Sequence, residues 1–319
     1  MTTITTNIEL ANNHLKNEGI IAIPTETVYG LAGNIYSSKA IHKIYELKER
    51  PLSNPLIVHI HGIHELEKIA IGIPKVAYSL AEMFWPGPLT LLLPKKSVVP
   101  DLVTAGKKTV AVRIPQHQLT ISLLKSLDFP LAAPSANPFG SISPTSAAHV
   151  KHYFNGKLEH ILDGGPCLKG IESTIVGFEH NEPIIYRFGS IPVEHIEQIT
   201  GRVELKKTIK NSPYTPGMSP HHYAPNTPLI FTDNIKNQIQ SYSNKRVGLL
   251  LFNNRQQDYD VEIQEILSHN GNLVEASRNL YAAMHKLDKL NLDLIIAERF
   301  PNIGLGITIN DRLQRASVS

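Results

Sequence analysis

Over the first 205 residues, short apolar runs alternate with segments in which apolar positions recur every three or four residues. The short runs are typical of strands and the longer spacing is typical of helices. The predicted strands are IIAI (20–23), LIVHI (56–60), LTLLL (89–93), TVAVRI (109–114), PLAAP (130–134), STIVGF (173–178) and IIYRF (184–188). The predicted helices cover residues 7–17, 38–48, 74–84, 117–127, 146–154 and 192–199. This alternation indicates an α/β fold.

A second, smaller α/β pattern follows residue 228. The predicted strands are PLIFT (228–232), RVGLLLF (246–252) and LDLIIAE (292–298), and the predicted helices cover 234–243, 275–290 and 305–316. Strands that alternate with helices predict a parallel sheet whose faces are covered.

Between the two patterns, residues 212–228 read SPYTPGMSPHHYAPNTP, with five prolines in seventeen residues. Such a segment forms neither a helix nor a central strand. Composition alone favours a stiff interdomain linker. The bulky side chains of Tyr214, Met218 and Tyr223 favour the alternative of an ordered arm on a neighbouring surface. We therefore predict a domain over 1–205, an arm over 206–228 and a small domain over 229–319.

Composition narrows the function classes. The chain has 319 residues, 42% of them hydrophobic, enough for two domains. Residues 1–205 carry 18 Lys+Arg and 18 Asp+Glu, so they lack the basic field of a protein that grips nucleic acid. The single cysteine, Cys167, excludes a disulfide framework and favours a reducing, cytosolic setting. We see no signal peptide and no apolar run of the roughly 20 residues that span a bilayer.

The stretch over residues 24–59 carries many hydrogen-bonding groups between two apolar strands. Ser37 or Ser38 can cap the helix inside it, and that helix ends at Lys48, where the chain turns toward Arg50. The helix dipole alone favours cations at this end, so a structural role stays open. The alternative is a proline-stiffened loop that holds a polyphosphate, with bidentate contacts from arginine and a point charge from lysine.

Other polar groups also follow predicted strands. PSANP (134–138) and EST (172–174) fit simple turns, or loops that present a ligand at the strand ends of an open sheet. Arg113 and Arg187 end apolar strands and need an anionic partner, which a structural salt bridge could also supply. The HxHxxH run at 59–64 has no Cys or Asp beside it, so we predict no metal site. The P-loop, GxGxxG and GxSxG motifs are absent from the sequence.

The chain also carries a series of motifs that cover most of residues 18–228 in order. They are PTETVYGLAGN, KERPLSNPLIVHI, WPGPLTLLL, TVAVRIP, AAPSAN, SPT (143–145), DGG, ESTIV, RFG and PGMSPHHYAP. With them the chain resembles the YrdC-like family, in its long, two-domain form of L-threonylcarbamoyladenylate synthases. The resemblance implies a catalytic domain with a YrdC-like twisted mixed sheet and a smaller C-terminal domain with a Rossmann-like parallel sheet. It also implies that the arm folds over the active site.

The resemblance assigns site residues one by one. The family's KxR…SxN signature, which is implicated in catalysis, is matched by Lys48, Arg50, Ser135 and Asn137. The ATP-binding positions are matched by Arg50, Asn54, Thr109, Ser135, Ser143, Arg187 and Tyr223. The threonine-binding positions are matched by Thr27, His59, Arg113, Ala133 (through its backbone) and Ser173.

The activity that the resemblance implies is synthesis of L-threonylcarbamoyl-AMP and pyrophosphate from L-threonine, bicarbonate and ATP. ATP would be a substrate, with Mg²⁺ bound through its phosphates. A downstream tRNA threonylcarbamoyl transferase complex would use the product on ANN-decoding tRNAs, without stable tRNA binding by the synthase and without a membrane. The alternatives are a non-catalytic RNA-binding or ribosome-associated factor and a carbamoyl transferase with the same fold.

Overall fold

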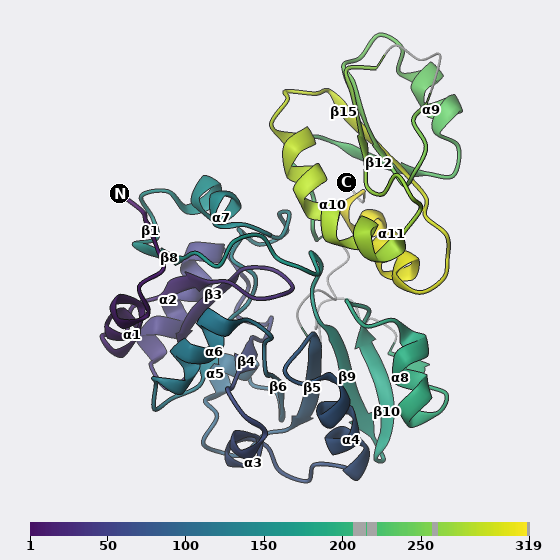
Figure 1. The fold of residues 1–319 in the computed structure, drawn as a ribbon. Coiled ribbons are helices and arrows are strands. Elements are labelled where there is room, and N and C mark those ends of the chain that lie inside the picture. The colour runs from purple at the N-terminus through teal and green to yellow at the C-terminus, as the bar shows by residue number, and fades with distance from the viewer. Residues whose placement is uncertain (207–214, 216–221, 257–260, 318–319) are drawn as a thin grey trace.

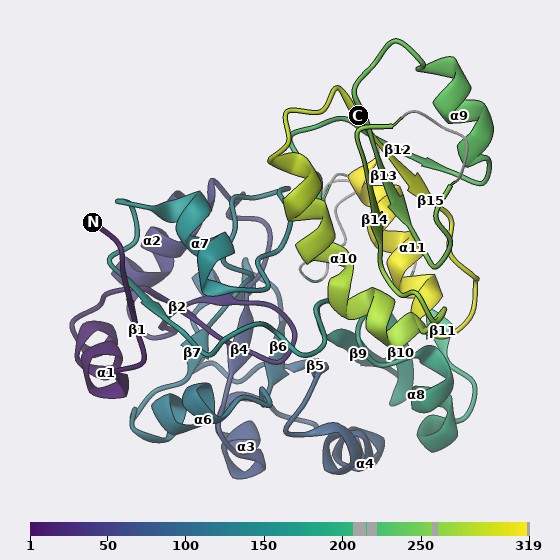
Figure 2. The ribbon, with the colours of Figure 1, turned by 45° about the horizontal axis from the view of Figure 1, so that its top comes forward.

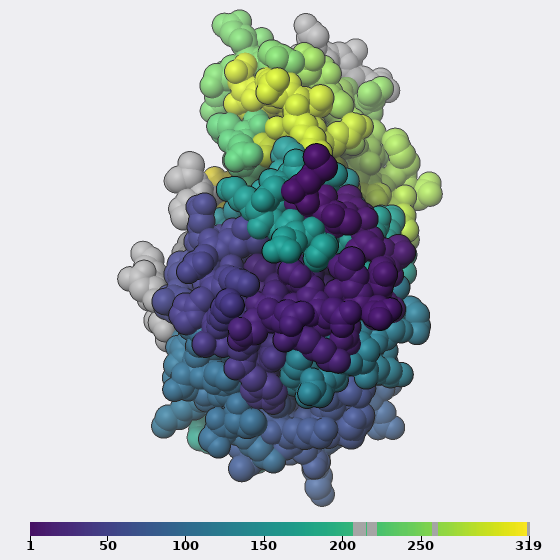
Figure 3. All heavy atoms as spheres, turned by 90° about the vertical axis from the view of Figure 1, so that its left-hand side faces the viewer, coloured from purple at the N-terminus to yellow at the C-terminus, as the bar shows by residue number. Residues whose placement is uncertain are grey.

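The computed structural model of the chain describes residues 1–206, 215, 222–256 and 261–317. These residues form a larger domain on a mixed sheet and a smaller domain on a parallel sheet (Figure 1). In the space-filling view of Figure 3, the smaller domain is a lobe seated on the larger one. The predicted α/β fold, with a mixed sheet first and a parallel sheet second, is confirmed. Most of the predicted arm lies outside the described residues.

The large sheet has eleven strands in the order β1-β8-β2-β3-β7-β4-β6-β5-β9-β10-β11. Parallel pairs such as β4/β6 and β5/β9 alternate with antiparallel pairs such as β3/β7 and β5/β6. In chain order the strands are β1 (Thr3–Thr5), β2 (Ile21–Ile23), β3 (Gly30–Asn34), β4 (Ile57–His59), β5 (Leu89–Pro94), β6 (Thr109–Arg113), β7 (Leu131–Ala132), β8 (His160–Leu162), β9 (Thr174–Glu179), β10 (Glu182–Arg187) and β11 (Glu204–Leu205).

Helices cover this sheet and bury its apolar positions. They are α1 (Ile8–Lys16), α2 (Ser38–Lys48), the 3₁₀ turn η1 (Ile63–Glu65), α3 (Leu66–Ile69), α4 (Lys75–Phe84), α5 (Asp101–Thr104), α6 (Gln118–Lys125), α7 (Ala147–Phe154) and α8 (Val193–Thr200).

Helix α2 shows how the local sequence shapes the site. Ser37, and not Ser38, is its cap, because the Ser37 hydroxyl accepts from the Ala40 amide at 3.1 Å. Ile41 and Ile44 are fully buried in the core of the large domain. Glu49 ends the helix in the left-handed region, which turns the chain toward the polar loop after it.

The predicted strands all lie in the sheets, and the differences from prediction are local. Strand β3 was not predicted, because GLAGN holds two glycines and little β-branched side chain. The run PLAAP forms only the two-residue β7, since prolines flank it. The short strands β1, β8 and β11 were also missed, as was β14 of the small domain.

The small domain has four parallel strands in the order β12-β15-β13-β14. Helices α10 and α11 lie between this sheet and the larger domain in both ribbon views (Figures 1 and 2). The elements are β12 (Leu229–Thr232), α9 (Ile235–Ser241), β13 (Val247–Leu251), β14 (Ile263–Ile266), α10 (Leu273–Asp288), β15 (Leu294–Glu298) and α11 (Leu305–Ala316). None of the described helices is long and apolar enough to cross a bilayer.

Candidate functional site

A cleft lies in the large domain where several strand ends meet the segment that enters the small domain. Its free space is about 40 Å³, which is room for only a few water molecules. The cleft is lined by Thr25, Thr27, Val28, Gly30, Arg50, Ile57, His59, Arg113, Ala133, Pro134, Ser135, Glu172, Ser173, Arg187, His222 and Tyr223.

One group of lining residues, the Arg113 wall, consists of Thr27, His59 and Arg113. Arg113 ends β6, is buried, and forms an ion pair with the buried Glu26 at 2.6 Å. Its guanidinium also donates to the Thr27 hydroxyl at 2.9 Å and to the Gly87 carbonyl at 3.2 Å. The arginine is thus held rigidly, which suits a cation that orients an anionic ligand.

His59 ends β4, directly beside Arg113 in the parallel register of β4 and β6. Burial, with a smaller effect from Arg113, lowers the pKa of His59 to about 3. The imidazole is therefore neutral at physiological pH. Its Nδ1 is buried without a hydrogen-bond partner among the described residues, so it is available to a ligand.

A second group of lining residues, the Glu172 wall, consists of Arg50, Glu172, Arg187 and Tyr223. Burial lowers the pKa of Arg50 to about 10, which still leaves it charged at neutral pH. Its guanidinium donates to the Asn54 side-chain oxygen at 2.6 Å and to the Pro55 carbonyl at 2.9 Å. The proline-stiffened loop thus positions the guanidinium of Arg50.

Glu172 is buried, and three side chains donate hydrogen bonds to its carboxylate. Its Oε1 accepts from the Ser143 hydroxyl at 2.7 Å, and both oxygens accept from the Tyr281 hydroxyl at 3.1 and 3.0 Å. Its Oε2 also accepts from Arg312 Nε at 2.9 Å. Burial raises the pKa of Glu172, but Arg312 and Arg187 outweigh it and the pKa is lowered overall. Glu172 is therefore a carboxylate whose two cationic neighbours come from both domains.

Arg187 and Ser173 connect the Glu172 wall to strand β5 of the large sheet. Arg187 donates to the Ser173 carbonyl at 2.8 Å and to the Ser173 hydroxyl at 3.0 Å. The same hydroxyl lies 2.7 Å from the Thr90 hydroxyl. The side chain of Ser173 is thus fixed between a strand of the sheet and a cation of the Glu172 wall.

Tyr223 closes the cleft from the segment before the small domain. Its side chain is buried, and its hydroxyl has no hydrogen-bond partner among the described residues. Its φ of 67° is in the left-handed region, where a tyrosine is strained. A strained backbone together with a buried, unpaired hydroxyl at a cleft is typical of a residue that contacts a ligand.

Several of the predicted site residues line the cleft together. These are Thr27, Arg50, His59, Arg113, Ala133, Ser135, Ser173, Arg187 and Tyr223. Others support residues that line it: Asn54 holds Arg50, and Ser143 holds Glu172.

Lys48 does not line the cleft. It is buried, and its Nζ donates to the carbonyls of Ser135 and Asn137 at 2.5 Å each. Burial, and next the charge of Arg50, lower its pKa well below the usual value. In the described conformation the lysine clamps the loop after β7. The Asn137 side chain donates to two carbonyls of the same loop.

Thr109 is also placed away from the cleft lining. It begins β6, and Arg113 ends that strand, so the two lie roughly 13 Å apart along it.

Sequence reasoning missed the partners that hold the site. Glu26 pairs with Arg113, and Tyr281 and Arg312 pair with Glu172. Tyr281 and Arg312 belong to α10 and α11, more than 100 positions away along the chain from Glu172. Their helical spacing indicates that they are buried but does not indicate what they contact.

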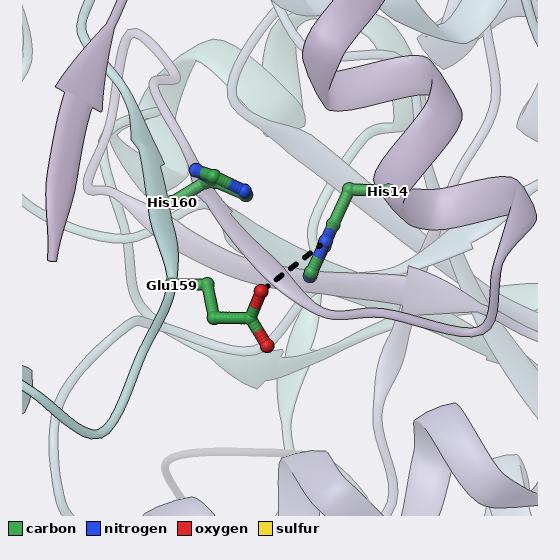
Figure 4. A group of neighbouring side chains, drawn as sticks. All are labelled: His14, Glu159 and His160. Carbon is green, nitrogen blue, oxygen red and sulfur yellow. Dashed lines mark ion pairs between the residues drawn. The ribbon is translucent and has the colours of Figure 1, made fainter. Parts of the chain in front are cut away.

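Among the described residues, one group of three side chains has the composition of a metal site: His14, Glu159 and His160 (Figure 4). His160 pairs with Ile21 at the start of β2, whereas the cleft residue Thr25 follows the other end of that strand. The candidate ligand atoms lie within 4.8 Å of one another, whereas tetrahedral zinc with bonds of about 2.0 Å holds its ligands roughly 3.3 Å apart. The Glu159 carboxylate lies 3.9 Å from His14 and is mostly exposed, as in a surface ion pair. We assign no metal to this group.

The comparisons with known proteins cover the whole chain. A family sequence model described as "Telomere recombination" matches residues 13–189, and one described as "Threonylcarbamoyl-AMP synthase, C-terminal domain" matches residues 191–318. The chain is similar to a threonylcarbamoyl-AMP synthase of Bacillus subtilis, with 40% identity over 95% of this chain and 90% of the relative. It is also similar to one of Pyrococcus abyssi, with 38% identity over 97% and 94%.

A solved structure agrees. The crystal structure of P. abyssi Sua5 complexed with L-threonine superimposes with a TM-score of 0.90 and 38% identity. It covers 97% of this chain and 94% of that one. The likeness therefore extends across both domains.

Proposed function

The chain belongs to the threonylcarbamoyl-AMP synthase family of enzymes, and we propose that it makes threonylcarbamoyl-AMP and pyrophosphate from L-threonine, bicarbonate and ATP. The observation that best supports this reaction is the cleft itself. It is lined by the buried arginines Arg50, Arg113 and Arg187, and each wall has a buried polar atom without a partner among the described residues, at His59 and at Tyr223. All three substrates are anionic at the groups that must be held.

We assign threonine to the Arg113 wall. The Arg113 guanidinium, already oriented by Glu26 and Thr27, is placed to receive the substrate carboxylate. His59 acts as a neutral hydrogen-bonding group, since a pKa of about 3 makes it a weak base at pH 7. Ser173 and the Ala133 backbone complete the predicted contacts.

We assign ATP to the Glu172 wall. Arg50 and Arg187 supply positive charge, and the Tyr223 hydroxyl supplies an unpaired polar contact. Ser135 lies in the loop that Lys48 clamps. We therefore propose that Lys48 orients the loop of Ser135 and Asn137 in the described conformation, and that its charge reaches the phosphates only if this clamp opens. Thr109 remains a predicted ATP contact.

The chemistry needs alignment more than covalent catalysis. The amine of threonine adds to bicarbonate, which gives a carbamate and releases water. A carbamate oxygen then attacks the α-phosphorus of ATP, and pyrophosphate leaves. The enzyme supplies charge neutralisation and proximity, which together can lower a barrier by several kcal/mol.

Mg²⁺ fits this site only through the nucleotide. Among the described residues that line the cleft, Glu172 is the only one with a carboxylate, and it already accepts from Arg312, Tyr281 and Ser143. Glu26 is paired with Arg113. Phosphate oxygens and water would therefore be its ligands, and the ion would neutralise part of the triphosphate charge.

We also propose that the segment around Tyr223 is the closure over the cleft. Carbamates and acyl-phosphate anhydrides hydrolyse readily, so a closed site protects them. Tyr223 is buried and lines this cleft from the segment that enters the small domain, so its side chain is placed to cover bound substrates. Transfer of the product to tRNA would be the task of a separate transferase.

The test is pyrophosphate release from ATP with threonine and bicarbonate omitted in turn. Release that requires both supports the synthase. Release that requires carbamoyl phosphate would indicate a carbamoyl transferase, and no release would indicate a non-catalytic factor. Valine in place of threonine should be rejected strongly, because the polar groups around the substrate hydroxyl would stay unpaired.

A further inference from the structure

A buried ion pair joins the small domain to the Glu172 wall of the cleft. Arg312 of α11 is fully buried, and its Nε lies 2.9 Å from Glu172 Oε2. Tyr281 of α10, also fully buried, donates to the same carboxylate. Two side chains of the small domain therefore hold a residue that lines the cleft of the large one.

The same two side chains also contact Tyr223. The Arg312 guanidinium lies 4.7 Å from the centre of the Tyr223 ring, within the range of a cation–π contact. The Tyr223 and Tyr281 rings stack with centres 5.9 Å apart and planes 26° from parallel. Glu172 and Tyr223 are thus held by one pair of residues, although they come from different parts of the chain.

Arg312 is fixed in turn by the large domain. Its Nη2 donates to the Phe188 carbonyl at 2.6 Å, directly after Arg187 of the Glu172 wall. Its Nη1 donates to Asp311 at 2.5 Å. The guanidinium therefore has specific partners on all three nitrogens, and lysine, with one nitrogen, can reproduce only part of this set.

The effect reaches Ser143 through Glu172. The Ser143 hydroxyl donates its hydrogen bond to Glu172 Oε1, so the Ser143 hydroxyl oxygen can act only as an acceptor toward a ligand. The Ser143 carbonyl also lies 3.2 Å from His285 Nε2 of α10. Without Arg312 the buried Glu172 carboxylate would lose its ion pair and keep only Arg187 as a cationic neighbour, so it would take up a proton or turn toward another partner. Either change would release the Ser143 hydroxyl.

We propose that Arg312 and Tyr281 are positioning residues, through which the small domain sets the geometry of the Glu172 wall and hence the affinity for ATP. The proposal rests on the assignment of ATP to that wall. It gives the small domain a specific task in a site formed by the large one. It also implies reciprocity: if docking of the small domain favours ATP, then bound ATP stabilises the docking.

The experiment measures kcat and both KM values by pyrophosphate release from the full-length chain. Arg312→Met, which keeps the length and removes the charge, should raise KM for ATP about tenfold or more and change KM for threonine less than twofold. Arg312→Lys should recover part of the loss. Tyr281→Phe keeps the stacked ring and removes one hydrogen bond, so it should raise KM for ATP by roughly threefold. The control is Arg246→Met, at an exposed arginine of the small domain that pairs with Glu262.

An equal rise in both KM values, or unchanged KM for ATP in a folded Arg312→Met chain, would overturn the proposal. If that variant does not fold, as judged by circular dichroism, Tyr281→Phe decides in the same way. Hydrogen exchange supplies an independent readout: a non-hydrolysable ATP analogue should protect α10 and α11 in the wild type and much less in Arg312→Met. Equal protection in both would contradict the proposal.

Failure of the proposed function is a separate result. Wild-type protein that releases no pyrophosphate would remove the synthase assignment. The positioning claim would then be judged by calorimetric titration of ATP into the wild type and Arg312→Met, where equal affinity would overturn it.

Discussion

The two walls of the cleft are built in different ways. The Arg113 wall is complete within the large domain, since Glu26, Thr27 and Gly87 all belong to it. The Glu172 wall takes two of its holding residues, Tyr281 and Arg312, from the small domain. One wall therefore depends on the local fold of a single domain, and the other depends on how two domains dock.

This difference gives the two walls different sensitivities. Changes in the large domain should affect either wall, whereas changes in α10, α11 or their interface should affect the Glu172 wall selectively. If the walls hold threonine and ATP as proposed, KM for threonine reports on the Arg113 wall and KM for ATP reports on the Glu172 wall.

Arg113→Leu should have the largest effect. It removes the cation assigned to the substrate carboxylate and leaves the buried Glu26 carboxylate without its ion-pair partner, with the Gln116 amide still donating to it. Loss of the cation from a buried ion pair typically costs about 3–5 kcal/mol. Pyrophosphate release at subsaturating threonine should fall by about 10²–10³-fold. Calorimetric titration of ATP alone should show affinity within about threefold of the wild type, because the Glu172 wall is intact. Loss of ATP binding in a folded variant would show that the walls are not separable.

Arg50→Ala should affect the Glu172 wall. A charged hydrogen bond contributes about 1.5–3 kcal/mol, so kcat/KM for ATP should drop about tenfold or more. Arg50→Lys serves as the matched control, because it keeps the charge and loses the bidentate geometry. Turnover close to that of the wild type in Arg50→Ala would argue against a phosphate role.

Tyr223 allows the closure to be separated from the hydroxyl contact. Tyr223→Phe removes the unpaired hydroxyl and should raise KM for ATP by roughly fivefold, the value of about one hydrogen bond. Tyr223→Ala also removes the ring that packs on Arg312 and Tyr281, so its effect should be larger. Steady-state kinetics with ATP varied compares the two variants. Equal, small rises in KM for ATP would show that the Tyr223 ring does not contribute to ATP binding.

Acid should weaken the docking of the domains. Burial first, and then His149, lower the pKa of His285 to about 3, against about 6.5 in the unfolded chain. His285 stacks on His149 and packs near Tyr153, and His152 and Lys289 add positive charge around it. Because the folded pKa is lowered, this histidine costs no stability above pH 6.5. It destabilises the folded state as the pH falls below that value.

Between pH 7.5 and 5.5, that single group should lower the free energy of unfolding by about 1.4 kcal/mol. Urea unfolding at the two pH values measures the loss. His285→Gln, which keeps a donor toward Ser143, should show a smaller loss than the wild type. The same loss in both would place the acid sensitivity elsewhere.

The sequence predicted one wall better than the other. Arg113 ends an apolar strand, and Thr27 and His59 belong to the polar stretch over residues 24–59, so the residues themselves draw attention to all three. Their assignment to threonine comes from the family resemblance. The Glu172 wall is less predictable, because Arg312 and Tyr281 appear as ordinary positions on amphipathic helices until the domains are placed together. Lys48 shows the converse case, since a helix-end lysine in a polar loop is expected to be exposed but is buried on two carbonyls.

The strands differ in the same way in how well the sequence predicts them. Long, apolar strands such as β5 and β6 were predicted from their side chains, whereas the glycine-containing β3 is a strand through its pairing with β2 and β7. Packing between distant segments, and not local preference, decides such elements.

The most direct test of the account is mass spectrometry of the product formed from ATP, L-threonine and ¹³C-bicarbonate. If this chain is the proposed synthase, we expect threonylcarbamoyl-AMP that carries the ¹³C label, and no such product when threonine is omitted. A product without the label, or pyrophosphate release that does not depend on threonine, would contradict it.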